Sequence, residues 1–182
     1  MDAVALIRRL HQHRAWVNHN LLEAASQLSD EQLRRTFPIG QGSIWKSLVH
    51  LFAAEYVWLE ALTGNETPVA PGDLPGKIPG NQEGANPLTG LADLKQQWSG
   101  LDRRCTDYLA GLRQESLDDL VYKTPSAAAQ AKRFGAKRSD VLLHVCTHAQ
   151  YTAAQAVNML RHSGVEKLPE VMVMAMARQE AQ

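Results

Sequence analysis

The chain has 182 residues, in which 19 lysines and arginines balance 19 aspartates and glutamates, and this length fits one domain over residues 1–182. The formal net charge is zero and no run of five or more like charges occurs, which gives a nucleic-acid partner no electrostatic support. No apolar run approaches the roughly 18 residues of a membrane span and the chain does not begin like a secretory signal, so we expect a cytoplasmic protein without a membrane partner.

A long amphipathic helix is predicted at the start of the chain. Apolar residues recur at helical spacing across residues 4–28. Ser29 and Gln32 then have the spacing of a capping box, so the chain should break and restart in a short turn before residues 37–40. Three histidines lie on this helix, and we interpret all of them as surface residues: His11, His13 and His19.

The next two helices are predicted on either side of a long loop. Ser43 is a suitable N-cap for a second helix over residues 44–62. Residues 65–90 contain five prolines and several glycines, a composition that predicts a long crossover loop. Apolar residues at helical spacing return over residues 91–112 and predict the third helix.

The last third of the chain is predicted to be helical, with no convincing strand pair. After a polar, turn-rich stretch, a fourth helix is expected at about Ser139–His162, where Gly164 ends it. Residues 171–179 are compatible with a short tail helix. Four long helices with one long connection indicate an all-α protein built as a four-helix bundle.

The fourth helix carries the most informative pattern in the chain. His144 and His148 are four residues apart, which places their imidazoles on one helix face together with Tyr151 and Gln155. His50 lies in an apolar stretch of the second helix, where an unpaired imidazole would be unfavourable. Three neutral imidazoles from two helices are a candidate divalent-metal site. The alternative is a structural network of hydrogen bonds to nearby polar side chains or backbone carbonyls.

Other catalytic motifs do not stand out. The chain has no glycine-rich phosphate loop and no G-x-S-x-G motif. Its two cysteines, Cys105 and Cys146, belong to different predicted helices and lack CxxC spacing, so we interpret both as buried thiols. Cys146 lies between the two histidines in sequence, but on a helical wheel its side chain points away from theirs.

Several of these segments together resemble a known family. The likeness is carried by His13–Asn18 and Leu28–Leu33 in the first helix, Leu48–Leu51 and Glu55–Leu59 in the second, and His144–His148 and Leu160–Gly164 in the fourth. In these segments the chain resembles the DinB-like (DinB/YfiT) proteins. The resemblance implies an up-down-down-up four-helix bundle that binds zinc or nickel through one histidine of the second helix and two of the fourth. It also implies a homodimer, and it places His50 and His148 among the metal ligands.

The chain departs from the family at the usual third ligand. The last helix of family members usually has three histidines at intervals of four, and the second and third of them look like the customary ligands. Here the third position is Thr152, whose neutral hydroxyl binds zinc poorly. The site is therefore either degraded or rebuilt. Rebuilding would recruit His144, one turn before His148, or else Glu55, Tyr151 or water.

Two functions are compatible with this resemblance. The first is a metal-dependent enzyme of stress or detoxification chemistry, a thiol S-transferase or a hydrolase acting on a small molecule. Its ion would lower the pKa of a bound thiol or water. Glu55, Tyr151 and Gln155 are the candidates for proton transfer or for orienting the ligands. The alternative, which Thr152 favours, is a metal-free and non-catalytic bundle that acts as a stress-associated binding or dimerisation module.

Overall fold

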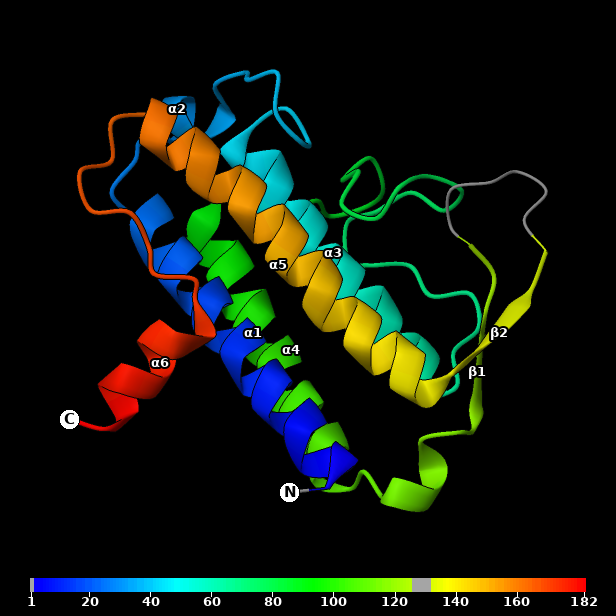
Figure 1. Cartoon of the computed structure of the whole chain (residues 1–182). Coiled ribbons are helices and arrows are strands. Elements are labelled where there is room, and N and C mark those ends of the chain that lie inside the picture. Colours follow the sequence, from blue (N-terminus) through cyan, green and yellow to red (C-terminus); the bar gives the residue numbers. More distant parts are fainter. Residues whose placement is uncertain (1, 126–131) are drawn as a thin grey trace.

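The computed structural model describes residues 2–125 and 132–182, and helices account for most of this part of the chain (Figure 1). Four helices are long: α1 (Ala3–Ala25), α3 (Ile44–Leu62), α4 (Leu91–Ala110) and α5 (Arg138–His162). Two are short: α2 (Asp30–Arg34) and α6 (Val173–Glu180). The prediction of an all-α protein is confirmed at this level.

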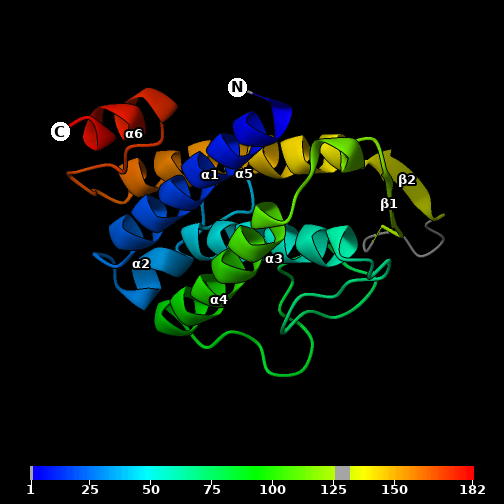
Figure 2. The same ribbon diagram turned by 90° about the horizontal axis from the view of Figure 1, so that it is seen from below.

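The long helices surround a common apolar core. α5 packs against both α1 and α3, and α4 contacts the same two helices (Figure 2). In Figure 1, α1 and α5 rise from the lower part of the view, whereas α3 and α4 descend. The largest fully buried side chains come from all four helices and include Leu21, Phe52, Trp98 and Leu142. No helix in the described ranges has the length and apolar character needed to cross a membrane.

Local sequence explains where several helices begin and end. The Ser43 hydroxyl accepts a hydrogen bond from a backbone N–H in the first turn of α3, which satisfies one of the free donors there. Ser29 and Gln32 form the complete capping box of α2, as predicted. Gly64 and Gly164 follow α3 and α5 with φ of 102° and 82°, a left-handed conformation that glycine adopts without strain.

The prediction that the chain lacks a strand pair is wrong. Between α4 and α5 lie a short 3-10 helix, η1 (Gln114–Ser116), and two antiparallel strands, β1 (Leu120–Lys123) and β2 (Phe134–Lys137). Each strand has only four residues, and β2 is mostly exposed. Neither strand therefore shows the apolar alternation by which strands are recognised in sequence.

The segment between α3 and α4 lies against the middle of α3. Gly80 packs so closely that a Cβ atom at this position would lie 2.6 Å from the Cα atom of His50. The carboxylate of Asp73 holds this part of the loop, because it accepts hydrogen bonds from the backbone N–H groups of Gly80 at 2.6 Å and Gln82 at 2.9 Å. The loop is thus fixed by specific contacts at the point where it meets His50.

Candidate functional site

α3 and α5 bring two of the three predicted metal ligands together. The Nε2 atoms of His50 and His148 are 3.2 Å apart, and the two rings meet edge to face with centroids 5.2 Å apart. Two nitrogen ligands of one tetrahedral ion, with bonds of about 2.0–2.1 Å, lie roughly 3.3 Å apart. The pair therefore has the spacing that two ligands of a single ion require.

The loop orients the His50 ring and selects its tautomer. The Nδ1 atom of His50 is 2.7 Å from the carbonyl oxygen of Pro79. A carbonyl can only accept a hydrogen bond, so Nδ1 donates and Nε2 presents its lone pair toward His148. His148 Nε2–H can then donate a hydrogen bond to His50 Nε2, or both Nε2 atoms can bind one cation. A backbone carbonyl behind a histidine is a common way of orienting a metal ligand.

The environment of His148 keeps its imidazole neutral. Burial, together with the neighbouring imidazoles of His50 and His144, lowers the pKa of His148 to about 4. At neutral pH the ring is therefore uncharged, which is the form that binds a metal ion.

His144 lies beside this pair without joining it. Its ring centroid is 5.8 Å from that of His148, and its ring packs edge-on against Trp58 at 5.2 Å. The side chain is exposed, and burial of part of the ring and the charge of Lys123 lower its pKa. Within residues 2–125 and 132–182, no three His, Cys, Asp or Glu side chains are arranged to hold a metal ion. A third ligand would require His144 to change rotamer, or would have to come from solution.

The other predicted residues of α5 take different positions. Thr152 is buried, with 2% exposure, whereas Tyr151 is 69% exposed. Gln155 packs against Gly40, where an added Cβ would lie 2.1 Å from the Gln155 Oε1 atom. Among the described residues, the paired histidines form hydrogen bonds to each other and to the loop, so neither Tyr151 nor Gln155 supports them directly.

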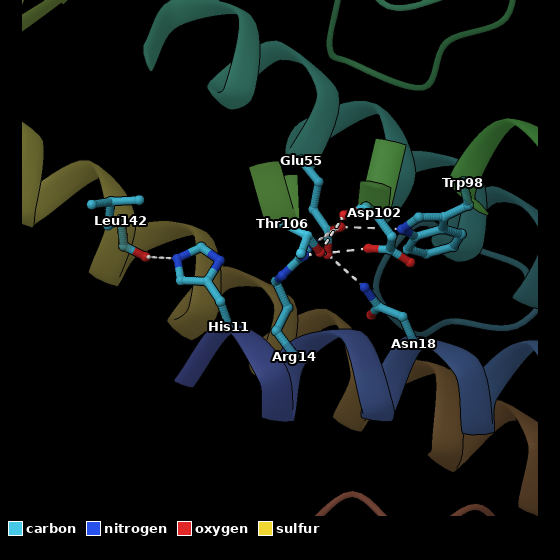
Figure 3. Close-up of polar contacts among 8 residues, drawn as sticks. All are labelled: His11, Arg14, Asn18, Glu55, Trp98, Asp102, Thr106 and Leu142. Atoms are coloured by element: carbon cyan, nitrogen blue, oxygen red, sulfur yellow. Dashed lines mark hydrogen bonds and ion pairs between the residues drawn. The ribbon is translucent and has the colours of Figure 1, made fainter. Parts of the chain in front are cut away.

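Glu55 belongs to a different cluster, in the core. We call it the Arg14 cluster, and it consists of Arg14, Asn18, Glu55, Trp98 and Asp102 (Figure 3). The Glu55 carboxylate accepts hydrogen bonds from Arg14, from Asn18 Nδ2 at 2.8 Å and from Trp98 Nε1 at 3.1 Å. Arg14 also lies 3.3 Å from Asp102. The cluster therefore joins α1, α3 and α4 around an ion pair whose side chains are 3% and 1% exposed.

The charges of this cluster depend on one another. Burial raises the pKa of Glu55, and hydrogen bonds from Asn18 and Trp98, with the charge of Arg14, oppose that rise. Burial alone would lower the pKa of Arg14, but the negative charge of Glu55 and Asp102 raises it above its usual value. Arg14 thus stays charged, and the ionised Glu55 carboxylate is its counter-ion. Removing Arg14 would leave the Glu55 charge uncompensated in the core, and removing Glu55 would leave Arg14 with only the partly exposed Asp102.

The interpretation of His11 as a surface residue is wrong. Its side chain is 5% exposed, and its Nε2 atom donates to the carbonyl oxygen of Leu142 at 3.1 Å (Figure 3). Burial, reinforced by the charge of Arg14, lowers the pKa of His11 to about 3. Of the other two histidines on α1, His13 is half-buried and His19 is exposed.

The two cysteines differ in burial. Cys105 is buried, as predicted, whereas Cys146 is only half-buried. Burial raises the pKa of the Cys105 thiol to about 11 and that of the Cys146 thiol to about 12. Both thiols are therefore protonated at neutral pH, and neither is an activated nucleophile.

Two buried polar features were not predicted from the sequence. The first is the buried face of α1, which was detectable because His11, Arg14 and Asn18 follow one another at intervals of three and four, the spacing of a single helix face. The second is Lys123, whose burial beside Trp58 depends on a hairpin that the sequence does not predict.

Comparison with known proteins agrees with this architecture. A family model described as the DinB superfamily matches residues 13–156, a span that runs from α1 into α5 and includes both paired histidines. No curated protein matches the chain. Because the family model covers well over half of the 182 residues, the chain belongs to the DinB superfamily.

Proposed function

We propose that this protein binds a divalent metal ion, zinc or nickel, through His50 and His148 and uses it as a thiol S-transferase or hydrolase. The 3.2 Å separation of the two Nε2 atoms carries the proposal. The hydrogen bond from His50 Nδ1 to Pro79 supports it, because that bond leaves the Nε2 lone pair free to coordinate. We further propose that the long helices form the up-down-down-up bundle of the family, which their directions in Figure 1 support.

We propose His144 as the third ligand. Its exposed side chain can rotate without displacing the core, although it would give up its contact with Trp58. Thr152 is less suited to the task, because a buried neutral hydroxyl is a poor zinc ligand. When bound, the ion would lower the pKa of a coordinating thiol or water and so supply a nucleophile near neutral pH.

The remaining predicted residues would act around this centre. Tyr151 is accessible to a small-molecule substrate, and Gln155 lies one turn further along α5. We propose both as candidates for contacting substrate, and Tyr151 as the candidate for transferring a proton, since the Gln155 amide does not titrate. Glu55 has no such role in the proposal, because its carboxylate is engaged with Arg14, Asn18 and Trp98.

Metal content tests the proposal. Tag-free protein purified without chelator, then loaded with zinc or nickel and desalted, would be measured by plasma mass spectrometry. We expect near one ion per chain in the wild type and in the control His162→Ala, whose exposed ring lies at the end of α5. His50→Ala and His148→Ala should bind the ion at least tenfold more weakly, because each removes a ligand. Equal metal content in all four proteins would contradict the proposal.

The second candidate is a metal-free, non-catalytic binding or dimerisation module. Buried Thr152 at the third-ligand position favours it. A patch of apolar side chains also supports it, because Leu10, Met172 and Val173 are exposed and line one hollow of about 310 Å³ between α1 and α5. In this case we expect a homodimer through that patch. Sedimentation equilibrium should show a dimer for the wild type and a monomer for Leu10→Asp, and a monomeric wild type would count against it.

A further inference from the structure

Lys123 is a largely buried lysine for which the described residues provide no acidic partner. It ends β1 on the same face of the strand as the core residue Val121, and its side chain is only 7% exposed. Its Nζ atom lies 4.6 Å from the ring centroid of Trp58. Among the described residues, no carboxylate lies within salt-bridge distance of this ammonium group and no side-chain hydrogen bond reaches it.

This arrangement is unfavourable for folding alone. Lysine is rarely so buried unless it is paired, and burial lowers the pKa of Lys123. The contact with the Trp58 face offsets only part of that penalty. An apolar side chain such as that of Val121 would suit the same face of β1 better. A lysine at such a position, with no acidic partner among the described residues, is a candidate ligand-binding residue.

Trp58 connects this ammonium group to the histidines. Lys123 lies over the Trp58 ring, and His144 packs against the same ring at 5.2 Å. His144 is in turn 5.8 Å from His148, which meets His50. Because His144 is exposed and Trp58 is only half-buried, this side of the cluster is open to solvent.

The neighbouring charges do not neutralise the site. Glu66 is close to the end of β1, since its backbone carbonyl accepts from Thr124, but its carboxylate is paired with Arg133. Arg133 stacks on Tyr122 at 3.6 Å, and Tyr122 points to the other face of the strand from Lys123. A divalent ion at the histidine pair would add two further positive charges. The surroundings therefore favour an anionic ligand.

We propose that Lys123 is a substrate-binding residue and that the substrate is a small molecule with a carboxylate group, which the ammonium group binds. A single ammonium group, with no second cation on its face of β1, matches one carboxylate charge better than a phosphate dianion. The reacting end of the same molecule would lie toward His50 and His148. That last placement rests on the proposed metal centre, whereas the anion site itself does not.

Two small thiols separate the contribution of a carboxylate charge to binding from that of the thiol and the carbon chain. 3-Mercaptopropionate and 3-mercapto-1-propanol share a thiol and a three-carbon chain, and only the first carries a carboxylate. Each would be titrated into zinc-loaded and metal-free protein, with the indole N–H signal of Trp58 followed by ¹H–¹⁵N NMR. The indole signal of buried Trp98 serves as an internal control for folding.

We expect the wild type to bind the acid on the order of tenfold more tightly than the alcohol, as a charge-assisted hydrogen bond predicts. Lys123→Met keeps an apolar stem on Trp58 and should remove this preference. Lys137→Met is the matched control, because Lys137 lies on the same hairpin but its side chain is 56% exposed. It should keep the preference.

Equal binding of acid and alcohol by the wild type, or an unchanged preference in Lys123→Met, would overturn the proposal. The metal proposal fails in a different way. If the protein retains no zinc but prefers the acid in a Lys123-dependent manner, the anion site stands and the metal centre does not. If zinc binds and the acid is not preferred, the metal centre stands and the anion site does not.

Discussion

Replacing His11 with glutamine should flatten the acid dependence of stability. Burial and the charge of Arg14 lower the pKa of His11 to about 3, from 6.5 for a free histidine side chain. The unfolded chain therefore binds the proton more tightly, so this contribution to stability is complete above pH 6.5 and is lost as the pH falls toward 3. Each pH unit below 6.5 removes about 1.4 kcal/mol, which amounts to roughly 3 kcal/mol at pH 4.

Urea unfolding followed by circular dichroism at pH 7, 6, 5 and 4 measures this effect. The amide of His11→Gln can still donate to the Leu142 carbonyl, so the substitution removes the titration with little loss of packing. We expect this variant to lose about 3 kcal/mol less than the wild type between pH 7 and pH 4. His19→Gln, an exposed control on the same helix, should behave like the wild type. The same loss in all three proteins would refute the buried, neutral state of His11.

Three further substitutions have defined outcomes. Glu55→Gln leaves Arg14 with only the partly exposed Asp102 as its counter-ion. It should lower the free energy of unfolding by about 3 kcal/mol in urea titrations, whereas an unchanged midpoint would show that the Arg14–Glu55 pair contributes little. Gly80→Ala places a Cβ against the backbone of His50 and should weaken zinc binding at least tenfold in a chelator competition, because it displaces a ligand. Gly76→Ala, where the glycine has a similar φ and open space around it, should leave zinc binding unchanged. Thr152→His should raise zinc affinity at least tenfold and lower stability by about 1–3 kcal/mol through overpacking, and no gain in affinity would mean that this position does not reach the ion.

The long helices were predictable because each buries one continuous apolar stripe and carries local boundary signals such as Ser43 and Gly164. The hairpin was not, because its strands are too short for a periodic pattern. In addition, Lys123 occupies an inward position of β1 where an apolar residue is expected. Local sequence could not reveal that exception, since the contact that accommodates it is made by Trp58 on another element.

The candidate site was predictable only in part. His50 could be named because it interrupts an apolar helical stretch. His148 could be named because it follows His144 at helical spacing and because the chain resembles the DinB-like family. The hydrogen bond from His50 to the Pro79 carbonyl could not be predicted, because it depends on how the loop folds back on α3 around Asp73 and Gly80. These are contacts between residues far apart in sequence, and no local spacing encodes them.

The Arg14 cluster and the histidine pair use different faces of α3. Five residues separate His50 from Glu55, which corresponds to a rotation of about 140° around the helix axis. The Glu55 carboxylate is held by Arg14 and Asn18 of α1 and by Trp98 of α4. Rotating α3 would break these hydrogen bonds around a buried charge, so we infer that the cluster holds His50 toward α5.

A double substitution separates this orienting role from stability. Arg14→Met with Glu55→Leu removes both charges and should recover part of the stability that Glu55→Gln loses. Recovery is only partial, because Asn18 Nδ2 and Trp98 Nε1 lose their acceptor. If the cluster sets the rotation of α3, zinc affinity should nevertheless stay at least tenfold below that of the wild type in a chelator competition. Recovery of both properties would show that apolar packing alone orients α3, and that His50 meets His148 without help from the ion pair.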